Sequence, residues 1–221
     1  MVDKRSTRPV KTAVLVSGGG TNLQAIIDAN AFGEIKNFNL AAVISSNPDA
    51  YALQRAAFND IPSYIIDRKI FANRASFSEA VHKKLEDLDI ELVVLAGFNF
   101  VLDAPLLKAY KNKIINVHPA LIPSFCGIGH YGLHTHQAAL DYGVKVSGAT
   151  AHLCTIEADE GPIILQRAVP VLEGDTAETL QRRIMEDAEW KILPEAISLY
   201  CEDRLELDGR RIIIKPATDA E

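Results

Sequence analysis

The chain has 221 residues, of which 48% are hydrophobic and 24% are charged, and its formal net charge is -6. A chain of this length can bury roughly 70–75% of its unfolded surface, so it needs no disulfide or metal to fold. The acidic balance argues against a general nucleic-acid binder, whose phosphate contacts need an excess of Lys and Arg, although a few backbone N–H groups can still hold one phosphate.

The cysteines indicate a reducing compartment. Cys126, Cys154 and Cys201 are three in number and have no short spacing, so they form no disulfide framework. No apolar stretch of signal-peptide or membrane-span length follows the basic N-terminus. We therefore expect a cytoplasmic protein with no membrane partner.

Short apolar segments alternate with helical patterns in the first half of the chain. Helices are predicted at 22–29, 51–59 and 75–88, and another starts after the N-cap Asp103. Near-continuous apolar strands between such helices are typical of a parallel sheet with helices on both faces. The predicted strands are 12–16, 40–44, 63–66, 92–96 and 114–117.

The pattern changes after the fifth strand. A loop rich in glycine and aromatic residues is followed by a short helix, two strands, a long helix bent near Pro194 and a hairpin around Asp208-Gly209. The first of these strands alternates, which predicts an antiparallel strand with one exposed face. No linker interrupts the chain, so we predict a single α/β domain over 1–221. The predicted ranges are 124–133, 136–142, 146–153, 163–169, 177–201, 205–207 and 212–214.

A glycine loop, Ser17-Gly18-Gly19-Gly20, joins the first strand to the first helix. Backbone N–H groups at such a helix start favour an anion. Thr21 and Asn22 stand where a triphosphate-binding loop needs Lys, and Leu23 stands where a dinucleotide fingerprint needs a third glycine. A monophosphate pocket fits best. The alternative is a tight turn in which Thr21 or Asn22 only caps the helix.

A second polar motif, Asn116-Val117-His118-Pro119, ends the fifth strand. Ligands bind beyond the carboxyl ends of strands in open α/β sheets, and residues two apart on a strand share a face. Asp159 lies in a loop before another apolar strand, and a carboxylate near a histidine raises its pKa. The three side chains could polarise a carbonyl, stabilise an oxyanion and move a proton. The alternative is that they only close turns and pack.

Five segments, in this order, together resemble the phosphoribosylglycinamide formyltransferase family over about residues 12–200. The segments are SGGGTNLQAII (17–27), LAGF (95–98), INVHPALIP (115–123), LHTHQAA (133–139) and DEGPIILQ (159–166). The resemblance implies a Rossmann-like formyltransferase fold, a mostly parallel twisted sheet. It also implies formyl transfer from 10-formyltetrahydrofolate to the amine of glycinamide ribonucleotide in purine synthesis, with Asn116, His118 and Asp159 as the catalytic set.

The resemblance also implies which residues bind the substrates and a different role for each half of the domain. The half around 12–110 would hold the phosphate, and the half around 111–205 would carry the folate and catalytic loops. Two departures leave contacts open: Asn99-Phe100 stands where the family has Met-Arg, and the loop 126–132 is longer than the family's Pro-Gly link. The residues implied for glycinamide ribonucleotide are Gly20, Thr21, Asn22 and Glu189, and those implied for folate are Arg74, Asn99, Phe100, Val101, Leu102 and Asn116.

A metal site and two other functions are alternative interpretations of the sequence. Cys126, His130, His134 and His136 lie within eleven positions, but their spacing matches no closed zinc site, so no metal is expected. His152 and Cys154 alternate along a strand and indicate packing. Rival functions are a formyltetrahydrofolate deformylase and a non-catalytic nucleotide-binding module. The expected partners are glycinamide ribonucleotide and reduced folate, with no nucleic acid, and the chain is expected to be a monomer or a homodimer.

Overall fold

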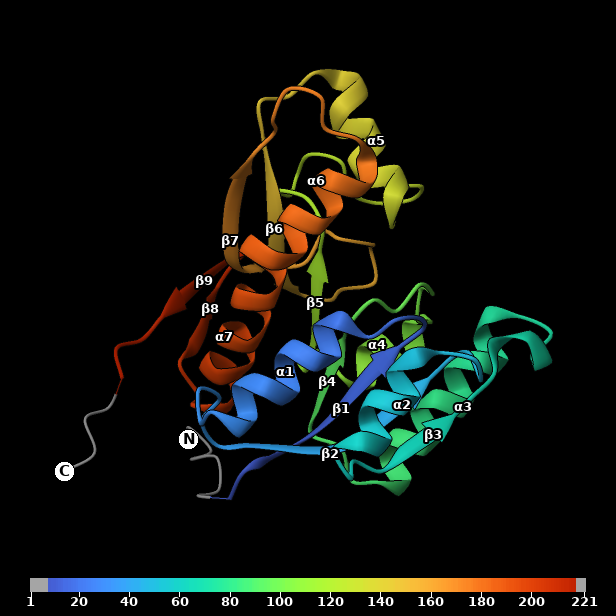
Figure 1. The fold of residues 1–221 in the computed structure, drawn as a ribbon. Coiled ribbons are helices and arrows are strands. Elements are labelled where there is room, and N and C mark those ends of the chain that lie inside the picture. The colour runs from blue at the N-terminus through green and yellow to red at the C-terminus, as the bar shows by residue number, and fades with distance from the viewer. Residues whose placement is uncertain (1–7, 218–221) are drawn as a thin grey trace.

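The computed structural model describes residues 8–217, which form a seven-stranded sheet covered by helices and a separate two-stranded hairpin (Figure 1). The elements are β1 (Val10–Val16), α1 (Thr21–Ala31), β2 (Phe38–Ser45), α2 (Tyr51–Phe58), β3 (Ser63–Ile65), the 3₁₀ turn η1 (Arg68–Ile70), α3 (Arg74–Asp87), β4 (Leu92–Leu95), α4 (Ala104–Ala109), β5 (Ile114–His118), α5 (Leu133–Tyr142), β6 (Val146–Leu153), β7 (Ile163–Pro170), α6 (Ala177–Ile184), the π turn η2 (Met185–Glu189), α7 (Trp190–Cys201), β8 (Leu205–Asp208) and β9 (Arg211–Ile214).

The strand order of the large sheet is β3-β2-β1-β4-β5-β6-β7. The strands β1 to β5 pair in parallel, and β6 and β7 are antiparallel additions. The order reverses between β1 and β4, which makes the carboxyl ends of these two strands the switch point where ligands bind in open α/β sheets. The predicted α/β class and the mostly parallel sheet are confirmed.

The sheet is buried on both faces. Side chains such as Val14 and Val94 pack under α1 and α7, whereas their neighbours Leu15 and Val93 pack under α3 and α4. This alternation explains why the strands read as continuous apolar runs, because each face needs its own hydrophobic row. The N-cap Asp103 is confirmed, since its side chain accepts a hydrogen bond from the N–H of Ala104.

Two predictions about the second half are wrong in detail. Only the first residue of β6, Val146, is exposed, because β5 and β7 flank the strand and its polar residues are buried along with the apolar ones. The helix predicted over 177–201 is divided by η2 into α6 and α7, and Pro194 lies inside α7. Pro194 has no N–H to donate to the carbonyl of Trp190, four residues earlier in the chain. The π turn η2 ends at Glu189, immediately before Trp190.

Among residues 8–217, no helix combines the length and the apolar character that crossing a membrane would require.

Candidate active site

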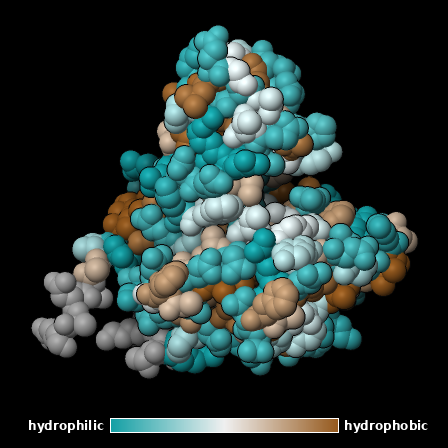
Figure 2. Space-filling model, viewed as in Figure 1, coloured by the Kyte–Doolittle hydropathy of each residue, from teal (hydrophilic) through white to brown (hydrophobic). Residues whose placement is uncertain are grey.

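The carboxyl ends of β1, β4 and β5 open into a cavity of about 720 Å³, a size typical of small-molecule sites. Its walls come from the glycine loop, from residues 95–102, from the end of β5, and from the loops 127–132 and 154–159. The outline of the molecule is notched between the part that carries α5 and the part that carries α3 (Figure 2). The predicted residues from both halves of the chain therefore line one cavity, with the exception of Arg74.

The glycine loop presents an uncapped helix start to this cavity. Gly20 is the N-cap of α1, and no side chain bonds to the first N–H groups of the helix. Gly20 has φ 70°, and a Cβ there would lie 2.6 Å from the Cβ of Ala52, so only glycine fits. Arg55 supports the loop by donating from Nε to the carbonyl of Gly19 at 2.8 Å. The alternative that Thr21 or Asn22 caps the helix is wrong, and the free N–H groups are available to an anion.

Asn22 instead contacts Glu189 across the cavity wall. Its Nδ2 donates to Oε2 of Glu189 at 2.6 Å, and both side chains are buried. Burial raises the pKa of Glu189 to about 7, although the hydrogen bond from Asn22 opposes that rise. The π turn η2 brings Glu189 to this position, and such turns often occur at functional sites. Oδ1 of Asn22 is buried without a hydrogen-bond partner in the described structure.

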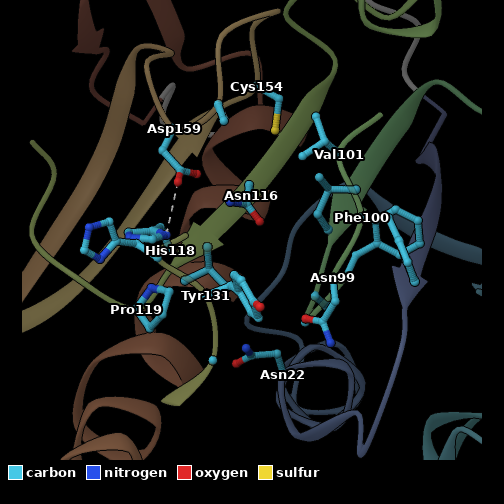
Figure 3. Close-up of a pocket in the computed structure, with 18 of the residues that line it drawn as sticks. Asn22, Asn99, Phe100, Val101, Asn116, His118, Pro119, Tyr131, Cys154 and Asp159 are labelled. Carbon is cyan, nitrogen blue, oxygen red and sulfur yellow. Dashed lines mark ion pairs between the residues drawn. The ribbon is translucent and has the colours of Figure 1, made fainter. Parts of the chain in front are cut away.

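The opposite wall brings together the three predicted catalytic side chains (Figure 3). Asn116 and His118 are two residues apart on β5 and share a face of the sheet. Asp159 reaches them from the loop between β6 and β7, with a left-handed φ of 57°. Its Oδ2 lies 3.5 Å from Nδ1 of His118. Asn116 and Asp159 are 43 positions apart in the sequence, and the fold brings them to the same wall of the cavity.

Backbone groups of the loop 124–132 complete the arrangement. His118 Nε2 lies 2.7 Å from the carbonyl of Phe125, and the N–H of Gly127 donates to Oδ2 of Asp159 at 2.9 Å. A carbonyl only accepts, so Nε2 of His118 carries a proton. The segment 126–132, which is longer than the family pattern, is thus bonded to Asp159 through Gly127, and Phe125, the residue just before it, is bonded to His118.

The charges of His118 and Asp159 depend on each other. Burial lowers the pKa of His118, while the carboxylate of Asp159 and the carbonyl of Phe125 oppose that lowering without cancelling it. As expected, Asp159 acts to raise the pKa of His118. The net pKa of His118 is nevertheless lowered, because burial has the larger effect. Burial also raises the pKa of Asp159, but the nearby ring of His152, the charge of His118 and the N–H of Gly127 hold that pKa below its ordinary value.

Sequence reasoning missed His152. This buried side chain is not simply a packing residue, because its Nε2 lies 3.2 Å from Nδ2 of Asn116 and 3.6 Å from Oδ1 of Asp159. The signal was available in part: once β6 pairs antiparallel with β5, the register sets His152 directly opposite Asn116. His136 is a third buried histidine at the cavity, after His118 and His152, and burial lowers the pKa of His136 to about 4.

The predicted folate-binding segment forms an aromatic wall. Phe98 and Phe100 both pack on the buried ring of Phe77, and the N–H of Asn99 donates to Oγ of Ser17 at 3.1 Å. Val101 and Leu102 also line the cavity. Arg74 lies outside the lining, with its side chain 59% exposed and Nη2 4.0 Å from Oδ1 of Asp103.

Within residues 8–217, no group of three or more His, Cys, Asp or Glu side chains is arranged to hold a metal ion.

The fold and the site define an α/β enzyme in which an anion-ready helix start faces a histidine, a carboxylate and an amide across one cavity. Residues 10–197 match the formyl transferase family, and the chain belongs to that family.

Comparisons with individual proteins agree with this assignment. The chain is 40% identical to phosphoribosylglycinamide formyltransferase of Haemophilus influenzae, over 89% of the chain and 90% of that protein. Glycinamide ribonucleotide transformylase 1 from Symbiobacterium toebii superposes with a TM-score of 0.89 at 44% identity, covering 96% of each chain. The trifunctional purine biosynthetic protein adenosine-3 of Gallus gallus is 40% identical over 92% of the chain, which spans only 20% of that longer protein.

Proposed function

We propose that this chain transfers the formyl group of 10-formyltetrahydrofolate to the amine of 5-phosphoribosylglycinamide, in purine synthesis in the cytoplasm. The observation that carries the proposal is the shared cavity. It joins an uncapped helix N-terminus, suited to one phosphate, to the polar group formed by Asn116, His118 and Asp159. The family match and the similarity to named formyltransferases support the same reaction.

Each half of the domain would hold one substrate. The N–H groups at Gly20, Thr21 and Asn22 would bind the phosphate, and Glu189 would accept hydrogen bonds from the ribose hydroxyls. The segment Asn99–Leu102 would line the folate pocket, as the lining residues and the aromatic packing of Phe100 support. Arg74 could serve only an outer part of the folate, because its exposed side chain lies outside the cavity lining.

The reaction would be a direct transfer. The substrate amine attacks the formyl carbon, a C–N bond forms, and the carbonyl oxygen becomes an oxyanion. Asn116 donates a hydrogen bond to this oxygen from Nδ2. The negative charge of the oxygen favours the protonated form of His118. The bond between the formyl carbon and the folate nitrogen then breaks, and the proton lost by the amine ends on that nitrogen. No metal or covalent intermediate takes part.

Asp159 would make the charged form of His118 accessible. Burial disfavours the imidazolium, whereas Asp159 and the carbonyl of Phe125 face its two N–H groups. Because Nε2–H already bonds to Phe125, it must leave that carbonyl to reach a substrate oxygen. In the described arrangement His118 acts on the oxyanion as a nearby charge.

The test is turnover of 10-formyltetrahydrofolate by the purified chain with glycinamide ribonucleotide, with initiator tRNA, or with water alone. We expect turnover only with glycinamide ribonucleotide, without ATP, NAD or added metal. Equal folate turnover and formate release without an acceptor would establish the deformylase instead. Ligand binding without any turnover would establish the non-catalytic module.

A further inference from the structure

The buried side chain of His152 contacts two of the proposed catalytic residues, Asn116 and Asp159, but has no role in the mechanism above. It lies on β6 directly opposite Asn116 of β5, so the two side chains project from the same face of the sheet. Its side chain is only 2% exposed. The side chain is therefore held in place by its neighbours, and its hydrogen-bond partners can be counted.

The two ring nitrogens of His152 have different partners. Nδ1 lies 3.1 Å from the carbonyl of Leu153, which can only accept, so Nδ1 carries a proton. Nε2 lies 3.2 Å from Nδ2 of Asn116, which can only donate. Nε2 therefore offers its lone pair, and His152 is a neutral imidazole in this contact. Oδ1 of Asp159, at 3.6 Å from Nε2, lies beyond hydrogen-bond distance.

A charged His152 would break this contact. Its Nε2–H would face the N–H of Asn116, and the amide would have to turn its oxygen toward the histidine. A second imidazolium would also share the carboxylate of Asp159 with His118 in a buried site, where like charges disfavour each other. The contacts therefore favour the neutral form, which keeps the amide in one orientation.

We propose that His152 is the positioning residue for Asn116: it accepts one N–H of Nδ2 and leaves the second N–H for the formyl oxygen. This deepens the proposed function, on which it rests. An amide nitrogen has two N–H groups, and fixing one fixes the plane in which the other points. A donor that is set before the reaction need not be reoriented as the oxyanion forms, which is the condition for effective electrostatic stabilisation.

The kinetic test compares His152→Leu with His152→Gln, whose Oε1 can replace the lone pair of Nε2. We expect His152→Leu to lower kcat about 10- to 100-fold, the size of a misplaced catalytic group, with the KM for both substrates within about threefold. His152→Gln should recover most of that loss. Thr12→Val, at another buried polar strand position outside the cavity, is the matched control and should keep normal kcat.

A double-mutant cycle shows whether His152 acts through Asn116. In an Asn116→Ala background, His152→Leu should cost less than about threefold, because the group it positions is gone. A loss equal to that in the unmodified chain would overturn the proposal, as would normal kcat in His152→Leu.

¹⁵N NMR of labelled histidine tests the tautomer without any activity. We expect a proton on Nδ1 and a lone pair on Nε2 of His152, and a protonated Nε2 at neutral pH would overturn the proposal. If His152→Leu fails to fold, this measurement on the unmodified chain still tests the proposal. Absence of formyl transfer in the unmodified chain would overturn the proposed function, whereas the ¹⁵N result would still decide the hydrogen bond.

Discussion

The two halves of the sheet contribute to one cavity by different means. The β1–α1 half offers backbone N–H groups at a helix start, next to the buried hydrogen bond that Asn22 donates to Glu189 of η2. The β5–β7 half offers two histidines and a carboxylate whose charges depend on one another. We propose that the first half holds a substrate and that the second changes charge during the reaction. Substitutions in the two halves should therefore fail differently.

The largest effect is expected in the second half. His118→Ala should lower kcat about 10²- to 10⁴-fold, the usual range for a group that handles charge or a proton, with the fold intact. Steady-state kinetics and circular dichroism measure the two outcomes. His82→Ala, which alters a histidine on α3 outside the cavity, is the control. Near-normal turnover in His118→Ala would remove His118 from the catalytic set.

Asp159→Asn separates charge from shape in the same half. The carboxylate raises the pKa of His118 against burial, so its loss should lower that pKa further. Because less His118 is then protonated, turnover should fall about 10- to 100-fold near neutral pH. Activity should partly return as pH falls and His118 regains its proton, to the extent that the substrate amine stays unprotonated.

NMR titration of labelled His118 in both proteins checks this shift directly. An identical pKa of His118 in the Asp159→Asn protein would show that the carboxylate does not act through charge, and would leave positioning of water or of the Gly127 loop as its role.

The same contrast explains what the sequence could predict. The strands of the first half and the Gly20–Asn22 loop follow from local patterns of apolar residues and glycine. Asp159 could be proposed as a partner of His118 from its loop before a strand, but only the family resemblance favoured that pairing, because nothing near Asp159 in sequence specifies a partner 41 positions away. Three contacts could not be predicted, since they depend on register or on backbone groups that leave no mark in sequence: His152 with Asn116, Glu189 with Asn22, and His118 with the carbonyl of Phe125.

Asn22→Leu tests the first half as a binding region. It removes the donor to Glu189 at the phosphate-facing helix start, so affinity for glycinamide ribonucleotide should fall about 10- to 100-fold while folate affinity stays nearly unchanged. Calorimetric titration with each ligand measures both. Gln24→Leu, on the same helix but outside the cavity lining, is the control. An equal loss for both ligands would indicate a folding defect instead of a lost contact.

The smallest effect concerns Glu189 of η2, the buried carboxyl group that contacts Asn22 of the first half. Burial raises the pKa of Glu189 from 4.5 to about 7, so the folded chain binds more protons than the unfolded chain between these values. The contribution of this group to stability is complete below about pH 4.5 and is lost as pH rises toward 7. The full shift would correspond to about 3 kcal/mol, but Glu189 lines a cavity that water can enter, so we expect about 1–2 kcal/mol.

Glu189→Gln keeps an oxygen for Nδ2 of Asn22 and removes the titrating carboxyl group. The free energy of unfolding of this variant should therefore fall less steeply than that of the unmodified chain between pH 4.5 and about pH 7. Urea unfolding at half-unit steps of pH measures the difference, and Glu186→Gln, exposed on the same π turn, is the control. Parallel curves for the unmodified chain and Glu189→Gln would show that Glu189 titrates normally. Glu189 would then add no pH dependence to the cavity wall that it forms with Asn22, and the contrast with His118 and Asp159 would be sharper still.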